Sequence, residues 1–304
     1  MYDAIVIGSG PAGCTASIYL ARNKLKTLLI AGYEYGGQLM LTSYVENFPG
    51  FKSILGRELM ERMIEQVKEL GIEIIEKNAT KVDFSSKPFK VIVEEDVFEA
   101  KRVLIATGAK PKLLGIGGEK ELIGRGVSTC ATCDAPLFKN KKVVVVGGGD
   151  TAMEYALTLS KFSKDVTVVH RREEFKASKI MVEKVKLLEN VKFKVPFVVE
   201  KIIGSEKVEA VLLKNVKNNE SEIFNCDGVF LAIGHAPNTE IFKGILEMDE
   251  NGYIKVDNKF ETSIKGVFAA GDCVDFKYMQ AITAAGDGCK AALEIIKSLE
   301  AENK

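Results

Sequence analysis

Two segments far apart in the chain repeat one pattern, which is an apolar run, a glycine-rich turn and a helix-like stretch. The first apolar run (4–7) leads into the turn GSGPAG (8–13), and the second (142–146) leads into GGGDTA (147–152). A continuous apolar run suits a strand that is buried on both faces of a parallel sheet. Each segment continues into another strand and so reads as a βαβ unit. The sequence therefore predicts an α/β protein with two Rossmann-like, three-layer domains.

Further apolar runs suggest how the two domains share the chain. The runs 102–109 and 228–235 each end in a small residue and a glycine, and a third run (266–273) ends in Gly271-Asp272. The tail from 281 to 299 has an amphipathic helical pattern. The length of 304 residues allows about two domains of ~150 residues. We expect the second domain to be inserted in the first, with residues 1–112 and 240–304 forming one domain and residues 113–239 the other.

The two glycine-rich turns have the context that a dinucleotide site requires. In such a turn the first glycine permits the tight bend, the second lets a pyrophosphate approach the backbone, and the third lets helix and strand pack closely. The N-terminus of the helix then offers N–H groups to the phosphates. One departure is that the strand after the first turn ends at Ala31-Gly32, where an acidic ribose ligand is usual. Glu34, slightly beyond, is the candidate replacement.

The second site carries cations at the corresponding position. Its second strand ends in His170-Arg171-Arg172, and Lys176 follows. An acidic residue there would bind a ribose 2′-hydroxyl, whereas cations complement a 2′-phosphate. Arginine can bind phosphate with two parallel hydrogen bonds, and lysine adds a point charge. The pattern favours NADP(H) over NAD(H).

Two of the six cysteines, Cys130 and Cys133, are separated by two residues and are followed by Asp134. Zinc generally needs four ligands, but the chain has no second CxxC and only two histidines, so a zinc site is not expected. An inert pair or a redox-active dithiol remains, and we favour the dithiol. Asp134 is either a turn residue or a carboxyl that exchanges a proton with a leaving thiolate. The solitary cysteines are expected to be small buried apolar residues; they are Cys14, Cys226, Cys273 and Cys289.

Charge and hydropathy limit the partners. Lys+Arg and Asp+Glu number 42 each, which argues against nucleic acid or an anionic membrane as the main partner. No apolar stretch reaches the ~18 residues of a membrane span, and the N-terminus opens directly on a strand pattern. We therefore expect a cytoplasmic protein that binds neither membrane nor nucleic acid.

Two dinucleotide sites and a dithiol together suggest a path for electrons. A nicotinamide donates a hydride and a disulfide accepts two electrons, and a flavin can connect the two because flavins accept hydride. On this reasoning the first site binds FAD and the second binds NADPH.

These and further motifs occur together in one known family. The chain resembles the low-molecular-weight thioredoxin reductases, the bacterial and archaeal type, over essentially its whole length. The motifs that carry the resemblance are GSGPAG, GGQL (36–39), VENFPG (45–50), ATG (106–108), CATCD (130–134), GGGDTA, HRR, AIGHAPN (232–238), FAAGD (268–272) and QAIT (280–283).

The resemblance implies a thioredoxin-disulfide reductase that is a homodimer. It implies that NADPH reduces FAD, that reduced FAD reduces the Cys130–Cys133 disulfide, and that the dithiol reduces oxidised thioredoxin or a thioredoxin-like protein. Cys130 matches the cysteine that attacks thioredoxin, Cys133 the one that faces the flavin, and Asp134 the proton donor. The resemblance also implies a rotation of the NADPH domain, with hinges near residues 108–115 and 234–240.

The same resemblance assigns the cofactor contacts residue by residue. For FAD they are Ser9, Gly10, Pro11, Ala12, Gln38, Asn47, Asp272, Gln280 and Ala281, with Asp272 on the ribityl chain. For NADPH they are Thr151, His170, Arg171, Arg172 and Lys176. The chain departs from many members at Lys176 and at Met279, where those members have arginine.

Two rival interpretations share parts of these patterns. One is a flavin enzyme without a dithiol step, similar to ferredoxin or flavodoxin–NADP reductases, and the other is a non-enzymatic nucleotide or zinc sensor. The CxxC pair argues against the first because that chemistry does not use it. The shortage of further ligands argues against a zinc sensor.

Overall fold

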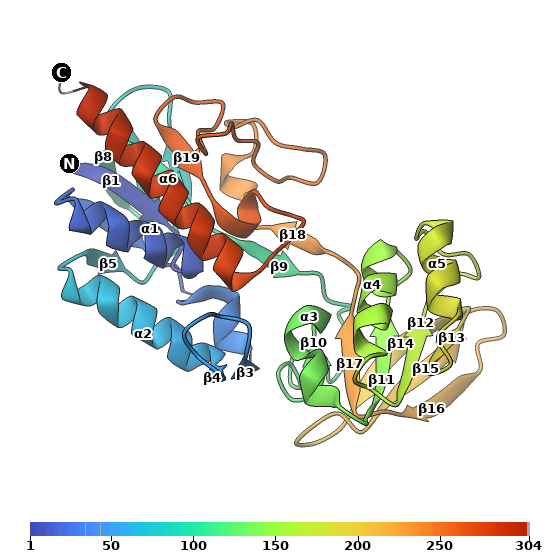
Figure 1. Ribbon diagram of the computed structural model, residues 1–304. Helices are drawn as coiled ribbons and strands as arrows, with labels where there is room; N and C mark the ends of the chain where they lie inside the picture. Colours follow the sequence, from blue (N-terminus) through green and yellow to red (C-terminus); the bar gives the residue numbers. More distant parts are fainter. Residues whose placement is uncertain (34, 43, 303–304) are drawn as a thin grey trace. The chain divides into compact units, whose positions relative to one another are not determined.

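The computed structural model describes residues 1–33, 35–42 and 44–302 and divides into two compact units (Figure 1). Glu34, the candidate ribose ligand, lies outside the described residues. The first unit comprises Met1–Thr42, Phe48–Lys110 and Ala236–Lys304. The second comprises Pro111–His235, with which the short segment Ser43–Asn47 is grouped.

The first unit is built on a seven-stranded sheet. The strand order is β5 (Glu73–Ile75), β2 (Thr27–Ile30), β1 (Tyr2–Ile7), β8 (Asp96–Ile105), β7 (Phe89–Val93) and β6 (Lys81–Asp83), and β19 (Val267–Ala269) also pairs with β8. The pairs among β5, β2, β1, β8 and β19 are parallel, while β6 and β7 are antiparallel additions. The predicted apolar runs therefore lie in the parallel part of the sheet.

Both faces of this sheet are covered, which explains the unbroken apolar runs. The helices α1 (Pro11–Arg22), α2 (Gly56–Glu69) and α6 (Ala281–Glu302) share one core with Val6 and Leu104 of the strands. The neighbouring residues Ile5 and Ile105 belong to the core on the opposite face. Successive residues of a strand point to opposite faces, so every position of β1 from Ala4 onward is buried.

The C-terminal helix α6 is held to the sheet by a buried cation. The Arg102 side chain is 3% exposed, and it donates to the Ser298 hydroxyl over 2.9 Å. It also pairs with Glu302 at 2.7 Å, and Glu302 pairs in turn with Lys87 at 2.8 Å. These partners fix the last turns of α6 beside β8.

The second unit has three layers. Its parallel sheet has the order β10 (Val127–Ser128), β17 (Gly228–Leu231), β11 (Lys142–Val146), β12 (Asp165–Val169) and β13 (Val191–Lys194). An antiparallel sheet of β14 (Phe197–Ile203), β15 (Ala210–Asn215) and β16 (Ser221–Asn225) shares one core with it. The other face packs against α3 (Ala131–Asp134), α4 (Asp150–Leu159) and α5 (Lys179–Lys186). The prediction of an α/β fold with two Rossmann-like units is confirmed.

The two chain segments that join the units near residues 110 and 236 are hydrogen-bonded to each other. β9 (Ala109–Pro111) pairs with β18 (His235–Pro237). The Lys112 N–H donates to the Gly234 carbonyl, and the Asn238 N–H donates to the Gly108 carbonyl, each over 2.9 Å. The predicted hinges fall in these segments, and their movement stays a prediction.

The remaining elements are short. They are η1 (Gly37–Leu41), β3 (Tyr44–Val45), β4 (Ile54–Leu55), η2 (Ala135–Phe138), η3 (Glu240–Phe242) and η4 (Gly271–Cys273). Of the solitary cysteines, Cys14, Cys226 and Cys273 are buried as expected, and Cys289 is half-buried. Within residues 1–33, 35–42 and 44–302, no helix has the length and apolar character needed to span a membrane.

Candidate active site

The first glycine-rich turn leaves open space at its middle glycine. Gly8 has a φ of +111°, and a Cβ on it would lie 2.2 Å from the Ala106 carbonyl oxygen. A Cβ on Gly13 would lie 1.8 Å from the Gly8 oxygen, so these two glycines are required by the fold itself. A Cβ on Gly10 would meet no protein atom within 4 Å. Gly10 immediately precedes α1, so this space lies at the helix N-terminus, where phosphates bind.

The hydroxyl of Ser9 is used inside the protein. It donates to the Ala31 carbonyl over 2.8 Å and accepts the Gly36 N–H over 3.0 Å. Ser9 is 3% exposed, and its hydroxyl ties the end of β2 to the loop that carries Gly37. A Cβ on Gly37 would lie 3.4 Å from the Gly10 Cα, so this loop borders the open space. Any contact of Ser9 with a phosphate would therefore come from its backbone.

The carboxyl of Asp272 lies in η4, next to the position where this turn packs against α1. A Cβ on Gly271 would lie 3.0 Å from the Ala12 Cβ, which places η4 against the first turn of α1. The next residue, Asp272, has a buried Oδ1 without a hydrogen-bond partner among the described residues. Burial, reinforced by Asp275 and Asp287, raises the pKa of Asp272 to about 7. A buried polar atom normally has a partner, so this oxygen fits a hydroxyl donor of a bound ligand.

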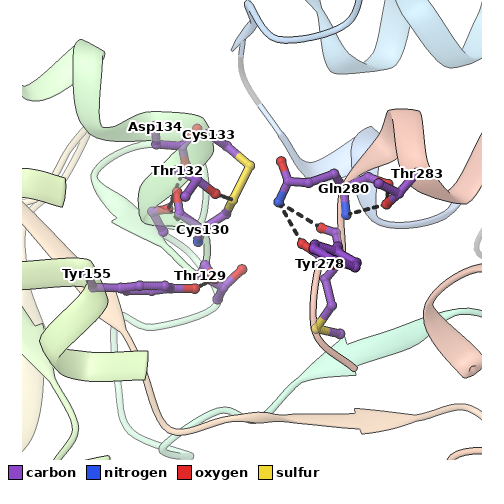
Figure 2. The surroundings of a disulfide bond; sticks show 11 residues. Thr129, Cys130, Thr132, Cys133, Asp134, Tyr155, Tyr278, Gln280 and Thr283 are labelled. Carbon is purple, nitrogen blue, oxygen red and sulfur yellow. Dashed lines mark hydrogen bonds between the residues drawn. A yellow bond between two sulfur atoms is a disulfide. The ribbon is translucent and has the colours of Figure 1, made fainter. Parts of the chain in front are cut away.

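The contacts of four other predicted FAD-binding residues give less direct support for a ligand. Gln38 is half-buried in η1, next to Gly37, and Ala281 begins α6. The Gln280 side-chain amide donates to the Tyr278 carbonyl over 3.0 Å (Figure 2). Asn47 is exposed and belongs to the segment that is grouped with the second unit.

The second glycine-rich turn repeats the geometry of the first. A Cβ on Gly147 would lie 2.3 Å from the Ala232 carbonyl oxygen, which matches the approach of Gly8 to Ala106. A Cβ on Gly149, which precedes α4, would meet no protein atom within 4 Å. Both turns therefore fit a dinucleotide pyrophosphate, because the first glycine of each packs against the end of the neighbouring parallel strand and the glycine that precedes the helix is open.

The cationic segment after β12 folds back onto this second turn. The backbone N–H groups of Lys176 and Ala177 both donate to the Gly148 carbonyl, over 2.7 and 3.0 Å. The His170 ring packs directly on Gly148, because a Cβ on this glycine would lie only 2.3 Å from His170 Cε1. The same ring stacks on Phe175. His170 therefore supports the turn as well as lying in the cationic segment.

Three cations converge near that histidine. Burial lowers the pKa of His170, and the charges of Arg171, Arg172 and Lys176 lower it further. All three cationic side chains are exposed, as is Thr151 in the first turn of α4. The segment thus presents positive charge next to the turn, as a 2′-phosphate site requires.

The two cysteines of the CATCD motif form a disulfide (Figure 2). The S–S distance is 2.06 Å and the Cα atoms are 5.4 Å apart. Cys130 precedes the single turn of α3, and Cys133 lies within it. Both cysteines are partly exposed. The predicted cysteine pair therefore forms a disulfide in a partly exposed position, as the redox interpretation requires.

Asp134 lies beside the disulfide in a buried setting. One oxygen, Oδ2, accepts a hydrogen bond from the Ser128 hydroxyl over 2.6 Å. The other, Oδ1, is buried without a partner among the described residues. Burial raises the pKa of Asp134, and the Ser128 hydrogen bond opposes that increase. A carboxyl whose pKa is raised in this way can hold a proton and release it to a neighbouring thiolate.

Comparison with known proteins shows which family has this sequence and fold. The family model described as pyridine nucleotide-disulphide oxidoreductase matches residues 2–288. The chain is 48% identical over 303 residues to the thioredoxin reductase of Rickettsia prowazekii, covering 97% of each chain. It is 46% identical over 296 residues to that of Mycolicibacterium smegmatis, covering 97% of this chain and 95% of the relative. The crystal structure of thioredoxin reductase from Streptococcus pyogenes matches with a TM-score of 0.95 and 40% identity, over 99% of both chains.

The chain belongs to the pyridine nucleotide-disulphide oxidoreductase family. Within it, the chain is of the low-molecular-weight thioredoxin reductase type. Its redox-active pair is the disulfide described above.

Three polar residues of this member's redox centre escaped the sequence analysis. The Ser128 hydroxyl donates to Asp134. The Thr132 hydroxyl lies 3.3 Å from the Cys130 sulfur, and the Tyr155 hydroxyl donates to the Thr129 carbonyl (Figure 2). Ser128 and Thr132 stand inside the stretch around the cysteines, so a search for hydroxyls near the pair would have found them. Tyr155 lies on α4 and has no local signal.

Proposed function

We propose that this thioredoxin reductase uses NADPH as electron donor, FAD as the internal carrier and thioredoxin, or a thioredoxin-like protein, as the disulfide substrate. The observation that carries the proposal is the Cys130–Cys133 disulfide beside the buried carboxyl of Asp134. The same polypeptide contains two glycine-rich turns, each of which is open at the glycine that precedes the helix, Gly10 and Gly149.

We assign FAD to the first unit. The backbone of Ser9, Gly10, Pro11 and Ala12 would bind the pyrophosphate at the N-terminus of α1. Asp272 would accept a hydrogen bond from the ribityl chain through its unpartnered Oδ1. The remaining proposed contacts are Gln38, Asn47, Gln280 and Ala281. A bound flavin supplies the conversion between hydride transfer and dithiol chemistry.

We assign NADPH to the second unit. Gly149 and Thr151 open α4, where the pyrophosphate would bind. Arg171, Arg172 and Lys176 would bind the 2′-phosphate, which NADH lacks. His170 supports the turn and completes the same site.

The dithiol performs the exchange with the protein substrate. In the reduced protein, the Cys130 thiolate attacks the thioredoxin disulfide; a mixed S–S bond forms, and one thioredoxin sulfur leaves and takes a proton from water. Cys133 loses its proton to Asp134 and attacks the Cys130 sulfur. The Cys130–Cys133 bond forms, and the second thioredoxin sulfur leaves and takes the proton from Asp134. Two electrons and the Cys133 proton have then moved from the cysteine pair to thioredoxin, the second proton has come from water, and the thiolates are the reacting species throughout.

The rival activity, a flavin–NADP reductase similar to ferredoxin or flavodoxin–NADP reductases, needs no cysteine pair. The formed disulfide and its acid neighbour favour the thioredoxin activity over it. We also propose that the chain forms a homodimer, which light scattering of the purified protein tests directly.

The decisive experiment is reduction of oxidised thioredoxin by NADPH, followed with a disulfide dye. Wild type should turn over, and Cys130→Ser and Cys133→Ser should not. Each variant should still bleach its flavin absorbance with NADPH, because flavin reduction precedes the dithiol. Turnover that survives in Cys130→Ser would overturn the proposal. Flavin-dependent reduction of ferredoxin, with equal rates in wild type and both variants, would favour the rival activity.

A further inference from the structure

Ser128 contacts both Asp134 and the backbone of Cys130. It is the last residue of β10 and is 6% exposed. Its hydroxyl lies 2.6 Å from Asp134 Oδ2 and accepts the Cys130 N–H over 3.1 Å. The Cys130 carbonyl oxygen is farther away, at 3.3 Å. The hydroxyl thus connects the acid to the backbone of the first cysteine.

The hydrogen bonds of this hydroxyl favour one oxygen of Asp134 as the site of a proton. A serine hydroxyl has one hydrogen and two acceptor lone pairs. The Cys130 N–H uses one lone pair, and the hydrogen is donated to Oδ2. A separation of 2.6 Å is typical of an O–H donor bound to a carboxylate. Oδ2 already accepts this hydrogen bond, whereas Oδ1 has no partner among the described residues, so Oδ1 is the oxygen better placed to take a proton.

We propose that Ser128 is a positioning residue for Asp134: it holds Oδ2, leaves Oδ1 to carry the exchanged proton, and keeps the carboxyl able to ionise in its buried setting. The inference rests on the proposed role of Asp134 in the thiol–disulfide exchange. Ser128 itself touches no reacting sulfur and acts through Asp134.

The groups around Asp134 define what Ser128 must balance. Cys133 shares α3 with Asp134, Cys130 immediately precedes that helix, and Tyr155 faces Asp134 from α4. Burial raises the pKa of Tyr155 to about 12, so the phenol is neutral at physiological pH and adds no charge. Burial also raises the pKa of Asp134, and Ser128 is the described neighbour that lowers it. Removing the hydroxyl should therefore raise the pKa of Asp134 further.

The test is an infrared pH titration of the isolated, oxidised protein. The carbonyl stretch of the protonated Asp134 carboxyl is assigned by its loss in Asp134→Asn. In Ser128→Ala the titration midpoint should move upward by about one pH unit, a tenfold change that matches the loss of one hydrogen bond to a charged group. Ser128→Thr keeps a hydroxyl and should restore the wild-type midpoint.

A matched control separates this effect from a general loss of stability. Ser163 is also a buried serine of the second unit and donates to the Phe138 carbonyl over 3.2 Å. Ser163→Ala removes a similar hydrogen bond away from the carboxyl and should leave the Asp134 titration unchanged. An unchanged midpoint in Ser128→Ala, or a shift that Ser128→Thr does not reverse, overturns the inference.

Thioredoxin reduction distinguishes this inference from the proposed function. The rate of thioredoxin reduction by the dithiol should fall in Asp134→Asn. If Asp134→Asn exchanges at the wild-type rate, the proton role of Asp134 fails, even where the infrared midpoint shifts in Ser128→Ala. If Asp134→Asn is slow and the midpoint in Ser128→Ala does not move, the role of Asp134 stands and that of Ser128 fails.

Discussion

Replacing Gly10 by alanine tests whether the open space in the first turn is a pyrophosphate site. The added Cβ meets no protein atom within 4 Å. Gly10 has φ −69° and ψ −176°, a conformation that alanine adopts readily. Alanine is a weaker helix cap than glycine, so we expect Gly10→Ala to lower the free energy of unfolding of the ligand-free protein by at most ~1 kcal/mol. By contrast, the Cβ of Gly13→Ala would lie 1.8 Å from the Gly8 oxygen and should destabilise the fold itself.

The effect of Gly10→Ala on FAD should be larger. A methyl group forced into a filled contact costs about 1–3 kcal/mol, and each ~1.4 kcal/mol weakens binding tenfold. We therefore expect the affinity for FAD to fall by about 10- to 100-fold, with little change in thermal stability of the ligand-free protein. The assay is titration of the apoprotein with FAD, followed by flavin fluorescence, together with thermal unfolding without ligand.

The second turn supplies the reciprocal control. Gly149 also precedes a helix and is also open within 4 Å. Gly149→Ala should weaken NADPH by a similar factor and leave FAD affinity unchanged, while Gly10→Ala should do the reverse. Wild-type FAD affinity in Gly10→Ala would refute the assignment of the open space. Loss of FAD in Gly149→Ala with none in Gly10→Ala would show that the two cofactors are assigned to the wrong units.

Three further outcomes follow from the described contacts. Replacing Arg171 and Arg172 together by alanine should raise the KM for NADPH by about tenfold or more, because hydrogen bonds to charged groups are lost. The KM for NADH should not change. Equal changes for both nucleotides would contradict the 2′-phosphate assignment. Thr132→Val should raise the pKa of the reduced Cys130 thiol by less than about one pH unit, since one hydrogen bond to the thiolate is removed. The measurement is thiolate absorbance against pH. An unchanged thiol pKa would mean that the hydroxyl does not stabilise the thiolate. Ion pairing with a buried arginine and a lysine lowers the pKa of Glu302 from 4.5 to about 2, so the stabilisation by these ion pairs is present above pH 4.5 and is lost as the pH falls toward 2. Because the side chain is 47% exposed, Glu302→Gln should lower the free energy of unfolding by only about 1 kcal/mol at pH 7 and not at all near pH 2. Chemical unfolding that shows the same loss at both pH values would contradict this linkage.

The glycine-rich turns show how much of the nucleotide sites local sequence could predict. The roles of Gly8, Gly10 and Gly13 follow from their spacing after an apolar strand, and the structure shows the expected close approaches at the first and third positions. The role of the Ser9 hydroxyl could not be predicted in this way. Its partners, Ala31 and Gly36, lie in segments that only the folded sheet brings to the turn.

The cationic segment shows the same division. The position of Arg171 and Arg172 after a strand predicted a phosphate site. The sequence did not show that the His170 ring would pack on Gly148, or that Lys176 would hydrogen-bond back to the same residue. Such contacts depend on how the chain returns after β12, and no periodic pattern encodes that path.

Short-range chemistry in this chain was readable because it depends on neighbours in sequence. Cys130 and Cys133 are separated by only two residues and form a disulfide, and each glycine-rich turn joins a strand to the helix that follows it. The protonation properties of Asp134 and Asp272 were decided by the tertiary structure. Asp272 is half-buried, with its Oδ1 enclosed, in a turn that packs on Ala12, far away in sequence, and Asp134 is half-buried near a tyrosine of another helix. The pKa of a carboxyl depends on the solvent and charges around it, and only folding sets those.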